Sequence, residues 1–356
     1  MPRLATAFSA ATTTSGPFPF PALVPEQSTG RVSVQSTVPV FSSELTNQPG
    51  TGIRRTIADT DLTVHPLALG SSVFGWTADG DMSMRILDRH LELGGNFLDT
   101  ADSYAAGRSE VLIGHWLRTR GVRDRTVIAT KIGRNRDNPG LTPRSIIGAV
   151  QASLERLGTD YIDLLYFHFD DATVPLEESL GAVDVLMQSG QVRYLAASNF
   201  SAERLMEARV LAANGLPRFV ALQTHYNLVH REAFEASLAM VTRAQGMAVL
   251  PYFALAHGFL TGKYRTKADV AGTTRATRAA LYLNRKAFRV LGSLDRIAAE
   301  HDVAPATIAV AWLLAQSGVV APAASASHPD QVDALVAAAS IRLRRCDMVD
   351  LDRLSA

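Results

Sequence analysis

The sequence predicts an α/β protein whose body folds as one (β/α)8 TIM barrel, with a short N-terminal β-hairpin cap and a disordered N-terminal leader. Three observations carry this prediction. Short apolar runs alternate with amphipathic stretches eight times, the alternation occupies about 270 residues, and polar residues collect where the apolar runs end. Strand followed by helix, repeated in this way, gives a parallel sheet with helical crossovers, and eight such units match one barrel.

The predicted strands are short apolar runs, as expected for strands that are buried on both faces. They comprise residues 66–69, 96–99, 126–131, 162–168, 192–198, 219–223, 247–252 and 319–323. The predicted helices comprise residues 82–93, 109–119, 143–157, 176–189, 201–213, 231–245, 286–300 and 305–316. Before the first of these strands, the runs 54–57 and 62–64 flank a turn-like segment and predict the hairpin.

Capping residues support this division into elements. Thr142 followed by Pro143, and Ser201 before another helical stretch, are typical helix starts. An open, doubly wound sheet is the structural alternative. Such a sheet is expected to carry a G-x-G-x-x-G turn after its first strand, whereas residues 69–75 read Leu-Gly-Ser-Ser-Val-Phe-Gly.

The first 52 residues differ from the predicted barrel domain, residues 53–356. They are rich in Ser, Thr and Pro, carry no lasting periodicity, and contain only the charges Arg3, Glu26, Arg31 and Glu44. Such a segment buries too little apolar surface to offset chain entropy, so the composition predicts disorder. A bland tail or a wrongly assigned start codon is favoured over a targeting signal, because an Arg-rich amphipathic face and a signal-peptide apolar run are both missing.

The composition also narrows the range of partners. Lys and Arg total 35 against 34 for Asp and Glu, so there is no overall field to attract nucleic acid or an anionic membrane. The single cysteine, Cys346, excludes an internal disulfide and fits a cytoplasmic location. The longest apolar tract, 304–324, is interrupted by polar residues and Pro322, which favours a buried helix and strand over a membrane span.

Polar residues that are costly to bury end three successive predicted strands. These are Asp99, Lys131 and His168, and Tyr104 follows the first of them by five residues. Each alone is weak evidence, because a lone residue of these types is more often a turn former, a cap or rim packing. In a barrel, however, the C-terminal strand ends meet at the mouth where active sites lie, so the four together predict a catalytic site.

The chemistry of this set fits carbonyl reduction, which needs an acid to protonate the developing alkoxide. A phenol keeps its proton at neutral pH, and we expect the Lys131 ammonium to lower the pKa of Tyr104. Asp99 is expected to hold Lys131 charged, and His168 to polarise the carbonyl oxygen. We expect no metal, since several ligands at close spacing are missing from the sequence.

With these residues in place, the chain from about residue 54 onward resembles the aldo-keto reductase superfamily. The segments that carry the resemblance occur in family order, at residues 96–104, 129–131, 166–168, 192–200 and 258–264. The resemblance implies a hydride transfer from NADPH to an aldehyde or ketone, with the family's tetrad carried by Asp99, Tyr104, Lys131 and His168.

The resemblance also implies the cofactor contacts. Ser198, Asn199 and Gln223 match the residues that hold the nicotinamide carboxamide, and Tyr252 matches the aromatic residue that stacks on the nicotinamide ring. The pyrophosphate and adenosine-phosphate contacts implied by the family are Phe253, Leu255, Gly258, Lys263, Ser325, Ser327 and Gln331.

Three departures bear on cofactor choice. Residues 252–255 lack the family's Ser-Pro, Ser327 stands where relatives often have Arg, and Ala334-Leu335 replaces the usual Glu-Asn pair. The lost charge partner leaves NADPH favoured and NADH as the alternative. The positive charge at the 2′-phosphate would then come from the basic residues Lys263, Arg265, Arg275 and Arg278.

Other readings stay open at this point. An NADPH-binding regulatory subunit with little turnover is one alternative, and an NAD(P)-dependent sugar or alcohol dehydrogenase is another. The segment 266–284 is predicted as a mobile surface insertion or as a clamp over the cofactor, with equal weight. The sequence predicts a small-molecule carbonyl substrate. It indicates neither the identity of that substrate nor the oligomeric state. Candidate pocket residues are Trp76, Phe167, Phe169, Tyr226 and His257.

Overall fold

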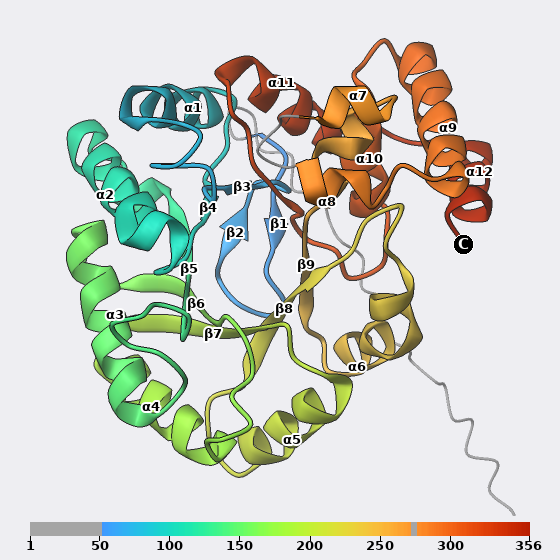
Figure 1. Cartoon of the computed structure of the whole chain (residues 1–356). Helices are drawn as coiled ribbons and strands as arrows, with labels where there is room; N and C mark the ends of the chain where they lie inside the picture. Colours follow the sequence, from blue (N-terminus) through green and yellow to red (C-terminus); the bar gives the residue numbers. More distant parts are fainter. Residues whose placement is uncertain (1–51, 272–275) are drawn as a thin grey trace, which may run out of the picture. The chain divides into compact units, whose positions relative to one another are not determined.

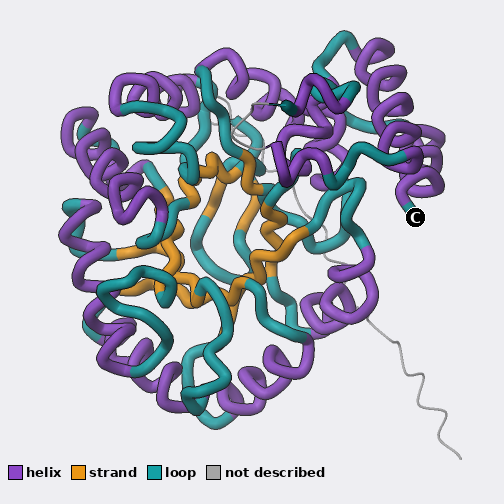
Figure 2. Tube along the Cα trace, viewed as in Figure 1, coloured by secondary structure: helices purple, strands orange, loops and turns teal. Residues whose placement is uncertain are grey.

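Eight parallel strands form the core of the protein, around a common axis and surrounded by helices (Figures 1 and 2). The computed structural model describes residues 52–271 and 276–356, so the predicted leader lies outside the described residues except for Gly52. The strands, in spatial order, are β10 (Ala323–Ala324), β3 (Ala68–Gly70), β4 (Phe97–Asp99), β5 (Val127–Ile132), β6 (Ile162–Phe167), β7 (Val192–Ser198), β8 (Phe219–His225) and β9 (Ala248–Tyr252). The predicted (β/α)8 barrel is confirmed.

The barrel closes between its last two strands by a short contact. Val249 of β9 forms a parallel bridge with Val319, supported by a bond from the Val320 amide to the Val249 carbonyl at 3.0 Å. The eighth strand itself is shorter and lies later than predicted. Pro322 interrupts the run because it has no amide to donate, although its carbonyl accepts from Ala68, and regular pairing with β3 begins at Ala323.

Helices follow the strands and cover the outside of the barrel (Figure 2). Their bounds are α1 Gly80–Glu92, α2 Arg108–Arg120, α3 Pro143–Leu157, α4 Leu176–Gln188, α5 Ala202–Ala213, α6 Ala239–Ala244, α7 Lys267–Val270, α8 Ala276–Ala280, α9 Arg285–His301, α10 Pro305–Leu314, α11 Pro329–Ala337 and α12 Arg345–Ser355. Thr142 and Ser201 cap α3 and α5 as predicted, each accepting from the backbone amide three residues on.

Two helical regions depart from the prediction. The predicted helix 231–245 is divided into a π-helical turn, Phe234–Leu238, and α6. Helix α12 was not predicted; it packs against α9, where Asp350 accepts from Ser293 at 2.6 Å. The described part of the segment 266–284 contains α7 and α8 and includes the buried side chains of Val270 and Ala279; whether the segment is a mobile insertion or a clamp stays a prediction.

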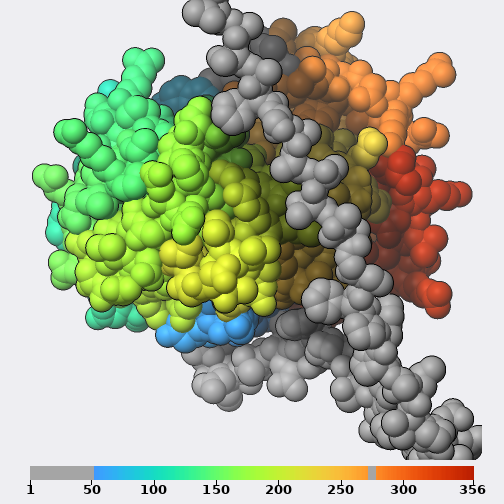
Figure 3. All heavy atoms as spheres, turned by 90° about the horizontal axis from the view of Figure 1, so that it is seen from below, coloured from blue at the N-terminus to red at the C-terminus, as the bar shows by residue number. Residues whose placement is uncertain are grey.

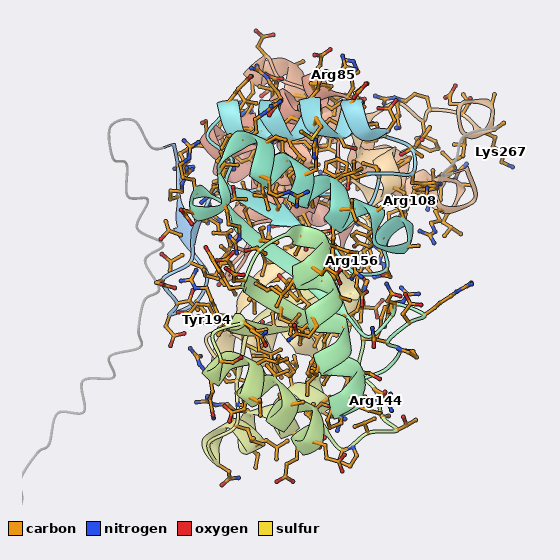
Figure 4. All side chains as sticks on the ribbon, turned by 90° about the vertical axis from the view of Figure 1, so that its left-hand side faces the viewer. Arg85, Arg108, Arg144, Arg156, Tyr194 and Lys267 are labelled. Atoms are coloured by element: carbon orange, nitrogen blue, oxygen red, sulfur yellow. The ribbon has the colours of Figure 1, made fainter. Side chains whose placement is uncertain are left out.

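The predicted hairpin is present as β1 (Arg55–Thr56) and β2 (Thr63–Val64), and it covers the N-terminal ends of the barrel strands. The Asn96 side chain, before β4, accepts a hydrogen bond from the His65 amide and donates one to the Thr63 carbonyl. Arg193 at the start of β7 forms an ion pair with Asp61 at 2.7 Å. This end faces the viewer's left in Figure 4, on the side of Tyr194, and appears as the blue patch at the lower edge of Figure 3. The hairpin therefore leaves the opposite end of the barrel for chemistry.

Alternation along the strands decides which side chains enter the barrel. The inner cluster contains Phe97, Ala129 and Leu164, whereas their chain neighbours Leu98, Ile128 and Leu165 pack outward against helices. Continuing the same alternation to the C-terminal ends turns six predicted site residues inward: Asp99, Lys131, His168, Ser198, Gln223 and Tyr252.

The apolar tract 304–324 noted in the sequence forms α10 and leads into β10. Within the described residues, no single helix is long and apolar enough to cross a membrane; α9 and α10 pass such a test only as a pair, and they are bent by 97°. Helix α10 is buried along nearly its whole length, as expected for a core helix.

Candidate active site

A buried ion pair between β5 and β4 forms the centre of the site. The Lys131 Nζ donates to the two Asp99 carboxylate oxygens at 2.9 and 2.8 Å and to the Thr100 carbonyl at 2.8 Å. The Lys131 side chain is only 1% exposed, and the Asp99 side chain 6%. Three acceptors around one ammonium satisfy the charge in a site with little water.

Tyr104 lies beside this pair on a tight turn, Tyr104–Gly107, that leads into α2. The Lys131 Nζ is 5.2 Å from the centre of the Tyr104 ring, and the ring meets His168 edge-on at a centroid distance of 6.2 Å. Ala105 and Ala106 have φ values of 49° and 56°, a region that costs alanine energy. The strained backbone of this turn positions the phenol over the barrel mouth.

The pKa directions differ in part from the expectation. Burial raises the pKa of Tyr104 above its usual value, and although the Lys131 charge opposes this, it does not outweigh it. Burial alone would lower the pKa of Lys131, but Asp99 and Tyr104 more than compensate and raise it. The pKa of Tyr104 is therefore raised rather than lowered as expected, because burial of the phenol outweighs the Lys131 charge, with a smaller contribution from Asp99; the phenol keeps its proton at neutral pH.

His168, just past β6, is buried and neutral. Burial, the Lys131 charge and Arg134 lower its pKa to about 2. Its Nδ1 is buried with no hydrogen-bond partner among the described residues, while its backbone carbonyl accepts from the Asn199 amide at 2.9 Å. A neutral imidazole with a vacant ring nitrogen suits a group that bonds an incoming polar atom.

The implied carboxamide contacts after β7 form a small chain of hydrogen bonds. The Tyr252 hydroxyl donates to the Asn199 Oδ1 at 2.7 Å, and the Asn199 Nδ2 donates to the Ser198 Oγ at 3.0 Å. Asn199 has a φ of 57°, a conformation that asparagine tolerates better than most residues. The three side chains therefore lie together at the mouth.

Gln223 of β8 pairs with Ser198 in the sheet, and its carbonyl accepts from the Asn199 amide at 3.4 Å. Its side-chain Nε2 donates to the Asp99 Oδ1 at 2.7 Å, and the side chain is 2% exposed. The Gln223 amide therefore also supports the Asp99–Lys131 pair from across the barrel. The sequence reasoning missed this contact because it links residues 124 positions apart.

The segment after β9 turns sharply and brings its backbone to the surface of the mouth. Phe253, His257 and Gly258 have φ values of 51°, 56° and 95°. A Cβ on Gly258 would lie 2.9 Å from the Lys263 side chain, so only glycine allows this approach. Leu255 is half-buried in the same turn, and the Lys263 ammonium lies 4.9 Å from the centre of the Tyr264 ring.

The residues matched to adenosine-phosphate contacts lie between β10 and α11. Ser325 approaches Ser72 with 3.3 Å between their hydroxyls, and the exposed Ser327 donates its amide to the Gln331 Oε1 at 2.8 Å. Helix α11 has no side-chain cap at its start. Serine hydroxyls beside an uncapped helix start are the chemistry that phosphate groups require.

The basic residues considered as substitutes for the missing arginine differ in availability. Arg265 is held by Asp295 through two bonds of 2.6 and 2.8 Å, so its charge is already paired. Arg278 is exposed, and Arg275 lies outside the described residues. Lys263 and Arg278, both exposed, are therefore the accessible candidates among the described residues.

The predicted pocket residues divide into two groups. Trp76 and Phe169 are 59% and 43% exposed, and His257 is half-buried at the mouth. Phe167 faces outward and packs on Phe200 and Phe219, and Tyr226 is buried and donates to Glu235. The pocket prediction is therefore wrong for Phe167 and Tyr226, because the inward alternation passes through His168 rather than Phe167.

Two buried acids behind Tyr104 were not singled out from the sequence. Glu110 on α2 is fully buried, accepting from the Thr130 hydroxyl at 2.5 Å and from Arg156 of α3 at 2.8 Å. Asp102 is also buried, and neither carboxyl oxygen has a partner among the described residues; burial and nearby Glu110 raise its pKa to about 7. An acidic residue on the inward face of a predicted helix is the signal that would have identified Glu110.

Comparisons with known proteins agree with this architecture. The aldo/keto reductase family model matches residues 66–356. Norsolorinic acid reductase B of Dothistroma septosporum is 30% identical over 335 aligned positions, covering 88% of this chain and 84% of that protein. Protein tas of Escherichia coli is 32% identical, covering 78% of this chain and 90% of that protein. An aryl-alcohol dehydrogenase of Pestalotiopsis microspora is 29% identical, covering 82% and 78%. The chain therefore belongs to the aldo/keto reductase family, a family of NAD(P)H-dependent carbonyl-reducing oxidoreductases.

Proposed function

We propose that the protein reduces an aldehyde or ketone with NADPH, using Tyr104 as the general acid. One observation carries this proposal: Tyr104 lies against a fully buried, fully bonded Lys131–Asp99 pair, with neutral His168 edge-on to its ring. This arrangement joins a proton donor, a fixed positive charge and a hydrogen-bonding imidazole at one barrel mouth, where barrel enzymes perform their chemistry.

Each side chain has a distinct part in the proposed reaction. Tyr104 delivers its proton to the carbonyl oxygen as negative charge develops there, and the Lys131 charge stabilises the phenolate that remains. Asp99 keeps Lys131 charged and in place, with Gln223 fixing one carboxylate oxygen. His168 orients the carbonyl through its ring; its low pKa keeps it a neutral donor rather than a competing acid.

NADPH is the proposed cofactor, and bound NADPH supplies the hydride. The Ser198, Asn199 and Tyr252 group offers amide and hydroxyl partners for a carboxamide, and Tyr252 offers an aromatic face. The left-handed turn at Gly258, the Lys263 ammonium and the start of α11 offer donors for phosphates. NADH is the alternative, because Ser327 has no charge for a 2′-phosphate.

The reverse flux is the second candidate. One relative carries the name of an aryl-alcohol dehydrogenase and another that of a reductase, so the same machinery is associated with both directions. A nucleotide-binding regulatory role is the third, and the intact set of Asp99, Tyr104, Lys131 and His168 argues against it, since a sensor does not need all four.

A two-step experiment tests the proposal. The purified protein is titrated with NADPH and with NADH by fluorescence, and a nitrobenzaldehyde is then added while absorbance of the reduced nicotinamide is followed. Tighter NADPH binding and steady oxidation are expected. Binding without turnover of several carbonyls would favour the regulatory role, and no binding of either nucleotide would overturn the proposal.

A further inference from the structure

A row of stacked side chains leads from the proposed catalytic centre to a positive charge. The Tyr104 ring meets His168 edge-on, His168 stacks on Phe169 with 5.4 Å between ring centres and 21° between planes, and the Arg134 guanidinium carbon lies 4.7 Å over the Phe169 ring. Arg134 comes just after β5 and Phe169 just after β6. The two neighbouring strand ends thus place a guanidinium one aromatic ring away from the imidazole.

The loop that carries Arg134 is fastened to the catalytic turn. Asn135 donates its side-chain amide to the Asp102 carbonyl at 2.8 Å, two residues before Tyr104, and Gly133 forms a bridge with Pro139. The base of the loop is therefore fixed relative to the phenol. The guanidinium lies over a stacked ring instead of extending freely into water, which gives it a defined direction.

This guanidinium forms no ion pair with any side chain in the described part of the chain. The acids nearest along the chain beyond β6 are engaged elsewhere: Asp170 pairs with Arg204 at 2.9 Å, and Asp171 accepts from the Leu141 amide and from Thr173. Lys131 is neutralised by Asp99 and His168 is uncharged. Arg134 is consequently a positive charge on this side of the mouth without an ion-pair partner among the described residues, and its field reaches both His168 and Tyr104.

The position separates this charge from the proposed nucleotide contacts. Those contacts follow β7, β8, β9 and β10, whereas Arg134 and Phe169 follow β5 and β6 in the strand order. Trp76, another exposed aromatic side chain at this end, follows β3, on the far side of β4 from β5. A phosphate of the cofactor is therefore not the natural partner of Arg134, and the substrate is.

We propose that Arg134 binds a carboxylate on the substrate, so that the enzyme prefers aromatic aldehydes or ketones that carry an acid group. This inference rests on the proposed reductase function and narrows its substrate class. The aromatic ring of the substrate lies among Phe169 and Trp76, its carbonyl points to Tyr104 and His168, and its carboxylate takes the planar fork of Arg134. Guanidinium and carboxylate match in charge and in two-point geometry, which gives both attraction and orientation.

Matched substrates and matched variants test this assignment. The substrates are the 2-, 3- and 4-carboxybenzaldehydes and the methyl ester of each, which keeps the ring and the aldehyde but removes the charge. The variants are Arg134→Gln, Arg134→Lys and the control Arg136→Gln, which removes an exposed arginine from the same loop. Steady-state kcat and KM are measured with saturating NADPH, at low and high salt.

The wild-type protein is expected to favour at least one acid over its ester in kcat/KM. Arg134→Gln should reduce that preference by about tenfold, mainly through KM of the acid, because the acid loses its charge partner and the ester has no such partner to lose. Arg134→Lys should keep part of the preference and Arg136→Gln all of it. High salt should weaken the preference to a similar extent in the wild type and in Arg136→Gln, because both keep Arg134.

Two results would overturn the assignment: no acid is preferred over its ester by the wild type, or Arg134→Gln lowers acid and ester rates equally. Turnover of the esters in either case would leave the proposed reductase function standing. Failure to turn over any of the six aldehydes, with nitrobenzaldehyde still reduced, would overturn the substrate assignment alone. Failure with nitrobenzaldehyde as well, despite NADPH binding, would overturn the reductase function and the substrate assignment with it.

Discussion

The two halves of the barrel mouth differ in the charge and burial of their side chains. On the side of β4, β5 and β6, the proposed catalytic groups are charged, buried and tied by short bonds, with Lys131 almost wholly excluded from water. On the side of β7 to β10, the proposed nucleotide contacts are mainly neutral, and several depend on backbone shape; Phe253 is 39% exposed with a φ of 51°.

This difference indicates that proton donation and cofactor binding have different structural requirements. A proton donor must be held in one geometry when the reaction occurs, and buried ionic contacts provide that rigidity. A cofactor that enters and leaves needs accessible contacts of moderate strength. Changes on the first side should therefore act on catalysis and stability, and changes on the second side on affinity.

The largest expected effect comes from removing the proton donor. Tyr104→Phe should lower kcat by about a thousandfold, the scale of general acid catalysis, because the ring stays but the proton is gone. NADPH affinity, measured by fluorescence titration, should stay within about twofold of the wild type. A variant that keeps full turnover would remove Tyr104 from its role and the comparison between the two halves with it.

Next in size is the buried ion pair behind the catalytic turn. Arg156→Met leaves Glu110 buried without its charge partner and should lower the free energy of unfolding by about 3 kcal/mol, read from urea midpoints. The control Arg120→Met breaks a pair whose side chains are 44% and 29% exposed, and should change stability by less than about 1 kcal/mol. Equal losses in both variants would contradict the rigid character of this side.

The pH dependence of stability gives a smaller effect from the same side. The pKa of Asp102 rises to about 7 on folding, so the folded state binds its proton more tightly than the unfolded chain. Its contribution is therefore fully present below about pH 4 and is lost as pH rises toward 7. Asp102→Asn should remove this pH-dependent loss, so that its free energy of unfolding at pH 8 is about 2 kcal/mol higher than that of the wild type. Parallel curves of unfolding free energy against pH for the two proteins would refute the prediction.

The smallest effect is expected on the nucleotide side. Tyr252→Phe keeps the ring but removes the hydroxyl that donates to Asn199, and should weaken NADPH binding by about fivefold, close to 1 kcal/mol. The urea midpoint should hardly change, because Asn199 is partly exposed and water replaces the lost bond. A large fall in kcat or in stability here would show that the two halves are not distinct.

Much of the fold was predictable because short apolar runs alternate with amphipathic stretches, and helices such as α3 and α5 begin at the recognisable caps Thr142 and Ser201. The inward positions of Asp99, Lys131 and His168 follow from the alternation of side chains along each strand. The contact between Gln223 and Asp99 does not, since it joins opposite walls of the barrel and depends on side-chain reach.

Other features also depend on three-dimensional packing. The left-handed turn after Tyr104 uses two alanines, a residue that gives no sign of such a conformation. The shortened last strand depends on Pro322, which the sequence shows but whose effect on pairing requires the position of its neighbour. Whether Ser327 weakens discrimination between NADPH and NADH is still a prediction.

The hairpin across the barrel base has a consequence for how the chain assembles. Its contacts with Arg193 and Arg218 join residues that are 132 and 159 positions apart. During synthesis Ile57, Leu62 and Val64 emerge early, yet the surface that covers them does not exist until β7 and β8 have been made. These apolar side chains therefore remain without their final packing partners through much of translation. The hairpin consequently packs onto the base of the barrel only at a late stage of synthesis.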